Sequence, residues 1–173
     1  MKMKYKTGRP SNEKQQKQVQ YLLKNNVDTS NMFNLRGQSA DRFWTTEFPL
    51  FNHDTVYARP LQVRSFDSLG NSDYNWSICF GFIDDFLKDD RLFNTFLKDV
   101  DTTLNLQDLS SMVEDTTSFK RLVDQHHDLY IVSFWAKYLG TPSISTIKTI
   151  EYFVDTSSRD IMHIKLNLGR WGK

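Results

Sequence analysis

The stretch 161-IMHIKLNL-168 is the clearest β-strand signal in the sequence. Its residues alternate between two kinds, the apolar Met162, Ile164, Leu166 and Leu168 and the polar His163, Lys165 and Asn167. Because successive side chains of a strand point to opposite faces, this pattern predicts a strand with one face in the core and the other in water. The preceding run 147-IKTIEYFV-154 places Ile150, Tyr152 and Val154 on one face. With the turn-forming residues 155–160 between them, the two runs predict an antiparallel β-hairpin at the C-terminus.

The middle of the sequence has helical spacing instead. Apolar residues at intervals of three and four predict one helix over about 84–99 and a second over 106–114, which Asn105 would cap. A third helix is expected to begin after Ser118. The run 129-LYIVSFWAKYL-139 fits either a continuation of that helix or a buried strand, and its periodicity does not separate the two.

The residues before this middle predict two more strands. The first lies in 55-TVYARPLQVRSF-66, where Pro60 indicates either an edge strand or a break into two short strands, because proline cannot donate to a ladder. A turn is expected at 67-DSLGNSD-73, and 74-YNWSICFGFI-83 has the composition of a buried strand.

These elements predict a single compact α+β domain with β-rich ends around a helical middle. The chain has 173 residues, of which 39% are apolar and 14% aromatic, and this is enough for one well-packed core. We place the globular α+β domain at residues 27–173. Residues 1–26 form a basic N-terminal arm that contains a short helix starting near Ser11.

The arm and the remainder of the chain differ in charge. Residues 1–24 carry seven basic side chains and one acidic side chain, Glu13, so their net charge is +6. The whole chain has a net charge of +1, which leaves −5 for the rest. A basic arm of this kind predicts a negative partner, either a polynucleotide or the acidic face of another protein subunit. The candidate contacts are Lys4, Lys6, Arg9, Lys14 and Lys17 in the arm and Arg170 and Trp171 near the C-terminus.

Within the arm, Gly8-Arg9-Pro10 resembles the core of an AT-hook, a motif that inserts an arginine into a narrow A·T minor groove. Thr7 stands where such hooks usually carry a basic residue. The alternative is a solvated tail in which Pro10 opens the following helix. We predict that the arm contributes charge more than recognition of a base sequence.

Candidate catalytic residues are few. The cluster 124-DQHHD-128 combines imidazole and carboxylate groups that suit Zn²⁺, Mn²⁺ or Fe²⁺. His126 and His127 would diverge on a helix or a strand, so a metal site would need His53 or His163 as well. Cys79 lies in an apolar run and is expected to be a structural thiol. Phosphate-loop, dinucleotide and nucleophile-elbow motifs do not occur, and we expect no cofactor.

These observations favour a non-enzymatic assembly or interaction subunit that forms an oligomer or larger assembly through protein partners. Aromatic-rich bodies with basic arms are common among viral structural proteins, so a viral or phage protein fits this description. The alternatives are a DNA-binding accessory or regulatory protein that uses the AT-hook-like arm, and a metal-dependent enzyme built around His126 and His127. No run of eighteen apolar residues predicts a membrane span, and we expect the protein in the cytoplasm, or in the virion if it is viral.

Overall fold

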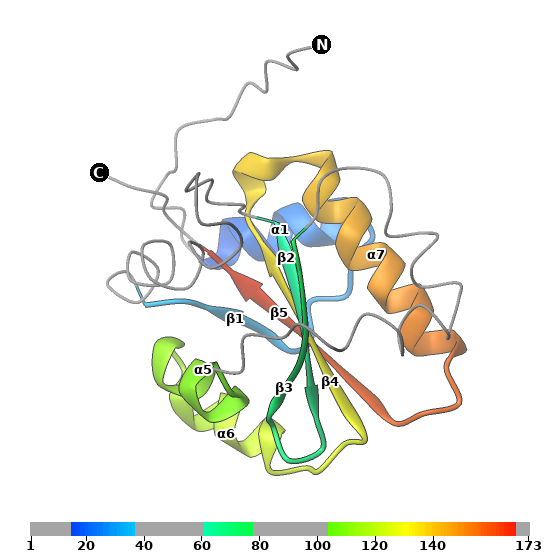
Figure 1. The fold of residues 1–173 in the computed structure, drawn as a ribbon. Helices are drawn as coiled ribbons and strands as arrows, with labels where there is room; N and C mark the ends of the chain where they lie inside the picture. Colours follow the sequence, from blue (N-terminus) through cyan, green and yellow to red (C-terminus); the bar gives the residue numbers. More distant parts are fainter. Residues whose placement is uncertain (1–14, 37–60, 78–103, 169–173) are drawn as a thin grey trace, which may run out of the picture.

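The computed structural model describes residues 15–36, 61–77 and 104–168 (Figure 1). Their elements are α1 (Gln15–Lys24), β1 (Met32–Asn34), β2 (Gln62–Asp67), β3 (Ser72–Ser77), α5 (Leu106–Met112), α6 (Thr116–Val123), β4 (Leu129–Trp135), a short 3₁₀ helix η3 (Lys137–Leu139), α7 (Thr141–Thr156) and β5 (Ile161–Asn167). Within the described residues the strands form one five-stranded sheet in the order β1-β5-β4-β2-β3. The strands β1, β5 and β4 are parallel, whereas β2 is antiparallel to both β4 and β3. The chain therefore combines helices with a mixed sheet, as the α+β prediction requires.

The predicted C-terminal hairpin is wrong, because residues 147–154 belong to helix α7. The buried residues Ile144, Ile147 and Ile150 recur every three residues, which is a helical stripe. Tyr152, which the two-residue period placed in the core, is exposed. Strand β5 pairs in parallel with β4 on one side and with β1 on the other. Parallel strands need a crossover connection, and α7 supplies it between β4 and β5.

The predicted water-facing side of β5 is also wrong. His163, Lys165 and Asn167 expose only 6%, 2% and 2% of their surfaces. Since β5 has a neighbour strand on each side and helices over both faces of the sheet, its polar row lies inside the protein. Strands in such parallel arrangements are normally apolar on both faces, so this row requires partners.

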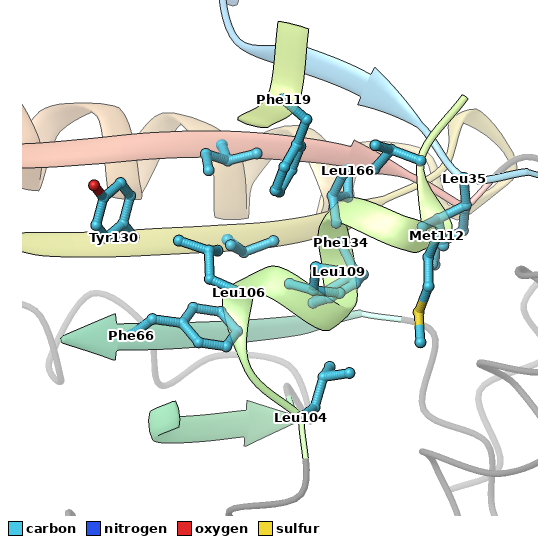
Figure 2. Close-up of a cluster of buried hydrophobic side chains, with 14 of the residues drawn as sticks. Leu35, Phe66, Leu104, Leu106, Leu109, Met112, Phe119, Tyr130, Phe134 and Leu166 are labelled. Carbon is cyan, nitrogen blue, oxygen red and sulfur yellow. The ribbon is translucent and has the colours of Figure 1, made fainter. Parts of the chain in front are cut away.

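Helices cover both faces of the sheet, and two groups of buried side chains lie beneath them. Under α5 and α6 is the α6-side core, shown in Figure 2, which includes Leu35, Phe66, Leu104, Leu106, Leu109, Met112, Val113, Phe119, Tyr130, Val132, Phe134, Ile164, Leu166 and Leu168. Under α7 and α1 is the α7-side core, which includes Leu22, Val27, Leu61, Val63, Leu129, Ile131, Trp135, Ile144, Ile147, Ile150 and Ile161. Consecutive residues of β4 alternate between these two cores.

Helix α5 begins as predicted. The Asn105 side chain accepts a hydrogen bond from the Asp108 backbone N–H at 2.7 Å, and the Asp108 carboxylate accepts one from the Asn105 N–H at 3.1 Å. This reciprocal capping satisfies two backbone donors that the first turn would leave open. Helix α6 starts at Thr116, slightly earlier than predicted, and the run at 129–139 forms the strand β4 followed by η3.

Strand β2 lies inside the sheet between β4 and β3, so an edge position for this strand is wrong. It begins at Gln62, two residues after Pro60, which leaves the ladder without a proline. The predicted turn that follows is confirmed, with the Asp67 carboxylate accepting hydrogen bonds from the N–H groups of Leu69 and Asn71. The helix predicted over 84–99 lies outside the described residues.

Candidate functional site

Most of the predicted partner-binding residues lie outside the described part of the chain. These are Lys4, Lys6, Arg9, Lys14, Arg170 and Trp171. Lys17 is described and is exposed on α1. The geometry of the arm therefore stays a prediction, as does the basic contact surface.

The structure separates the members of the 124–128 cluster. His126 is exposed just past α6, with a φ of 54°. His127 instead turns toward the loop before β5, where its Nδ1 lies 2.9 Å from Asp160 Oδ1. Asp128 accepts a hydrogen bond from the Asp160 backbone N–H at 3.2 Å. These contacts join the starts of β4 and β5. Over the described ranges, no three His, Cys, Asp or Glu side chains are placed to hold a metal ion.

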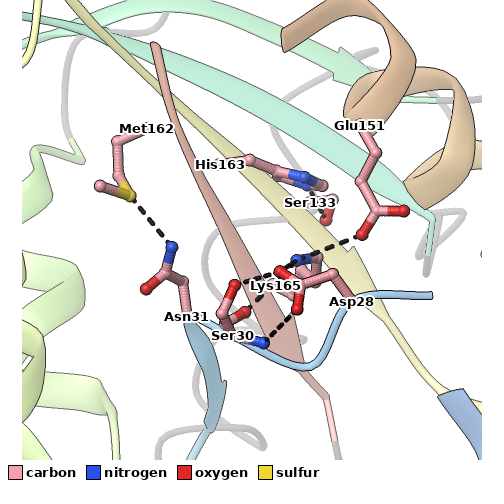
Figure 3. A network of polar contacts seen from close by, with 8 residues as sticks. All are labelled: Asp28, Ser30, Asn31, Ser133, Glu151, Met162, His163 and Lys165. Carbon is pink, nitrogen blue, oxygen red and sulfur yellow. Dashed lines mark hydrogen bonds and ion pairs between the residues drawn. The ribbon is translucent and has the colours of Figure 1, made fainter. Parts of the chain in front are cut away.

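Lys165 lies at the centre of a buried polar network (Figure 3). Its Nζ is 3.3 Å from Glu151 Oε1 on α7 and 3.4 Å from Asp28 Oδ2 in the turn before β1. It also donates a hydrogen bond to the Ser30 carbonyl oxygen at 3.3 Å. Ser30 in turn donates to the Asp28 carboxylate through its backbone N–H and its hydroxyl. One ammonium group thus joins α7, β5 and the segment that leads into β1.

The two carboxylates around Lys165 respond differently to their surroundings. Burial opposes ionisation of Asp28, but the hydrogen bonds from Ser30 and the charge of Lys165 outweigh it and lower the pKa of Asp28. For Glu151 burial dominates and raises its pKa, although Lys165 acts in the opposite direction. The carboxyl of Asp28 therefore ionises more readily than that of Glu151.

His163 and Ser133 form a second buried pair on the same face of the sheet. His163 Nε2 lies 2.8 Å from Ser133 Oγ. Burial, together with the positive charge of Lys165, lowers the pKa of His163 well below its ordinary value. A serine beside a neutral imidazole has the elements of a nucleophile and its base, but a reactive pair must also meet substrate. Both residues are buried, and no described residue bonds to His163 Nδ1 to orient the ring. The pair therefore fits a structural role better than a catalytic one.

An open groove of about 580 Å³ runs between β1 and α6. On the strand side it is bounded by residues of β1 and the turn before it, and on the helix side by one face of α6 with its flanking residues. The lining residues are Thr29, Asn31, Met32, Phe33, Asn34, Glu114, Asp115, Ser118, Arg121, Leu122 and Gln125. Phe33 packs edge-on against Phe119 of α6 at 5.0 Å. Phe33 and Leu122 form an apolar part of the lining, which we call the floor, and most of the other lining residues are polar.

The backbone of β1 faces this groove. Lys165 N–H bonds to the Asn31 carbonyl, and Leu35 N–H bonds to the Asn167 carbonyl. In a parallel pair, alternate residues bond to the neighbouring strand through their backbone groups. The N–H and C=O of Phe33 therefore point toward β5, while those of Met32 and Asn34 point away from it.

The connection between α5 and α6 closes one end of this exposed edge. The Glu114 N–H donates to the Asn34 carbonyl at 2.9 Å, and Arg36 Nε donates to the Val113 carbonyl at 2.8 Å. Three outward groups are left beside the groove, namely the N–H and C=O of Met32 and the N–H of Asn34. No described residue bonds to them.

The sequence did not indicate this groove or the Lys165 network. The three-residue strand β1 is too short to show a period, and the groove side of α6 carries an ordinary mixture of polar residues. The apolar composition of β4 was the one sequence feature that could have indicated that Lys165 is buried. Two strands separated by a segment with Pro142 at its start fit a parallel pair joined by a helix, which buries both faces.

Comparison with known proteins adds no further constraint, because no protein-family model, curated protein or solved structure matches the chain. In the described ranges, no helix has the length and apolar character to cross a bilayer.

Proposed function

We propose that this protein is a non-enzymatic interaction subunit that binds an extended polypeptide segment of a partner in the groove between β1 and α6. The observation that carries this proposal is the outward-facing backbone of Met32 and Asn34 along the groove. Adding a strand to an exposed sheet edge is a recurring way to recognise peptides, because main-chain hydrogen bonds give affinity for any sequence.

The helix side of the groove can give selectivity for the sequence of the bound segment, which backbone hydrogen bonds to β1 alone do not provide. Ser118 and Arg121 project from α6 on the groove side, and Gln125 follows it. Half-buried Phe33 and Leu122 offer an apolar surface between strand and helix. A bound segment would therefore place alternate side chains against this apolar floor and its remaining side chains in solvent.

The competing functions have weaker support. The enzyme hypothesis requires His126 and His127 to act together, yet His126 is exposed and His127 is engaged by Asp160. The DNA-binding hypothesis depends on the charge of the arm and on the AT-hook-like Gly8-Arg9-Pro10, and this motif lies outside the described residues. The groove, by contrast, is formed by described residues, and it is lined by backbone groups to which no other described residue bonds.

Peptide display against the full-length protein tests the proposal. Peptides selected from a random library should bind wild type and lose at least tenfold in affinity, about 1.4 kcal/mol, in R121E. The matched control is K120E, which makes the same charge change on the same helix at an exposed residue that does not line the groove. Backbone NMR should place the largest shifts at Met32 and Asn34. Selected peptides that bind R121E and K120E equally would contradict the proposal.

A further inference from the structure

The sequence contains a segment with the pattern that the groove requires. In 1-MKMKYKT-7, Met1, Met3 and Tyr5 alternate strictly with Lys2, Lys4 and Lys6. In an extended strand this alternation puts the apolar side chains on one face and the three lysines on the other. At about 3.3 Å per residue the segment spans about 23 Å, which is ample for pairing alongside the three residues of β1.

The surroundings of the groove match the two faces of this segment. Phe33 and Leu122 provide the apolar contact on the α6 side. Exposed carboxylates outnumber cations there. Glu114 and Asp115 line the groove together with Arg121, and Asp28, whose side chain is 60% exposed, lies in the turn before β1. A lysine-bearing strand is therefore attracted to this edge, while its Met and Tyr residues fit the floor.

We infer that residues 1–7 of one copy of the chain bind in the groove of a second copy as a strand added to β1. This inference rests on the proposed function and names its partner. A second copy is favoured over the same chain because α1 starts on the other side of the sheet. Leu22 anchors α1 to Trp135 and Ile147 under α7, whereas α6 covers the opposite face.

Each copy would then donate one segment and offer one groove. Reciprocal exchange between two copies gives a closed dimer, and exchange in one direction gives a ring or a filament. The added strand also covers the exposed edge of β1, which would otherwise be a site for non-specific strand pairing.

The decisive variant is M3K/Y5K in the full-length protein, which destroys the alternation while adding positive charge. Self-association is measured by light scattering and sedimentation over a range of concentrations. Strand addition predicts that M3K/Y5K weakens self-association at least tenfold, even though both substitutions add positive charge to the segment. An arm that acts through charge alone predicts the opposite, a tighter association of M3K/Y5K.

Competition with synthetic peptides tests the strand itself. A peptide of sequence MKMKYKT should dissociate the wild-type assembly, and a peptide of the same composition with its lysines grouped should not. Because alternate N–H groups of a strand point toward its neighbour, N-methylation of one alternate set should abolish competition and methylation of the other should be tolerated. Equal tolerance of both sets would overturn strand addition.

The outcomes also separate this inference from the proposed function. If display peptides require Arg121 but the wild-type chain is monomeric, the groove binds peptides and residues 1–7 of a second copy are not its ligand. If M3K/Y5K changes the NMR signals of Met32 and Asn34 in a monomer, the segment binds its own chain and the inference is wrong. If no peptide distinguishes R121E from K120E, the proposed function itself fails.

Discussion

β5 and β1 are neighbouring strands, but their polar groups have different surroundings. β5 pairs on both sides, and its His163 and Lys165 side chains are buried among partners from α7, β4 and the turn before β1. Among the described strands β1 pairs with β5 alone, and backbone groups of Met32 and Asn34 face away from β5 beside the groove. The polar side chains of β5 thus belong to the interior of the fold, while the proposed function depends on the backbone groups at the β1 edge.

The largest loss of stability is expected from a substitution of Lys165 in β5. K165M should lower the free energy of unfolding by about 3 kcal/mol, because it leaves Glu151 without its cation. The value lies at the low end for a broken buried pair, since the Asp28 carboxylate is largely exposed and water can solvate it. Chemical denaturation followed by circular dichroism measures the change.

Two controls accompany this prediction. K148M removes an exposed lysine from α7 and should change the free energy of unfolding by less than about 0.5 kcal/mol. Adding Glu151→Leu to K165M should restore part of the loss, because the unpaired carboxylate is then absent. Equal stability of K165M and K148M would show that the network does not stabilise the centre of the sheet.

A slightly smaller effect tests whether α1 belongs with the interior or with the edge. Leu22 is fully buried against Trp135 and Ile147, whereas its neighbour Leu23 is 56% exposed. L22A should therefore cost about 2 to 3 kcal/mol of unfolding free energy through the cavity it leaves, and L23A less than about 1 kcal/mol. Thermal and denaturant unfolding of the two variants gives the comparison directly. Similar losses in both would place α1 outside the core.

Titration of His163 gives the third effect. Its folded pKa lies well below the ordinary 6.5, so the unfolded chain takes up a proton that the folded chain does not. This contribution to stability is complete above pH 6.5 and is lost as the pH falls below it toward the folded pKa. One proton of difference corresponds to about 1.4 kcal/mol per pH unit.

H163Q replaces the imidazole beside Ser133 with an amide, which does not titrate. The unfolding free energy of this variant should therefore lack the slope due to His163. The neighbouring carboxylates contribute slopes of their own, which are common to wild type and H163Q. The raised pKa of Glu151 makes stability fall as the pH rises from its ordinary 4.5 toward the folded pKa, and the lowered pKa of Asp28 removes stability only as the pH falls below its ordinary 3.8. The difference between the wild-type and H163Q denaturation curves at several pH values near 6 therefore isolates His163. Identical slopes in wild type and H163Q would contradict a buried neutral imidazole.

Sequence patterns succeeded where local chemistry determines the element. The Asn105 cap, the turn at 67–73 and the strand at 161–167 depend on residues within a few positions of one another. They failed for α7, because its residues fit both a two-residue period and a helical one. Only the pairing of β5 with β4 decides between them, and that pairing joins residues about thirty positions apart.

The candidate site was even harder to predict from the sequence than the fold. A groove arises from the placement of α6 against β1, whose residues are more than eighty positions apart in the sequence. The charge asymmetry of the chain did indicate a basic arm and a negative partner, and it gave no location for that partner. Alternation in β5 was read correctly as a strand, yet burial of its polar row depends on α7 and β1, which the pattern of β5 itself does not contain.

The smallest change in stability is expected for substitutions in α6 beside the β1 edge of the sheet. R121E and K120E should each change the free energy of unfolding by less than about 0.5 kcal/mol, because both side chains are exposed in the last turn of α6. Arg121 attracts Asp115, but the hydrogen bonds from Ser118 contribute more to lowering the pKa of that carboxyl. Differential scanning calorimetry of both variants beside K165M checks the contrast. A loss above about 1 kcal/mol in R121E alone would assign Arg121 to the fold, and the edge of the sheet would then resemble its centre.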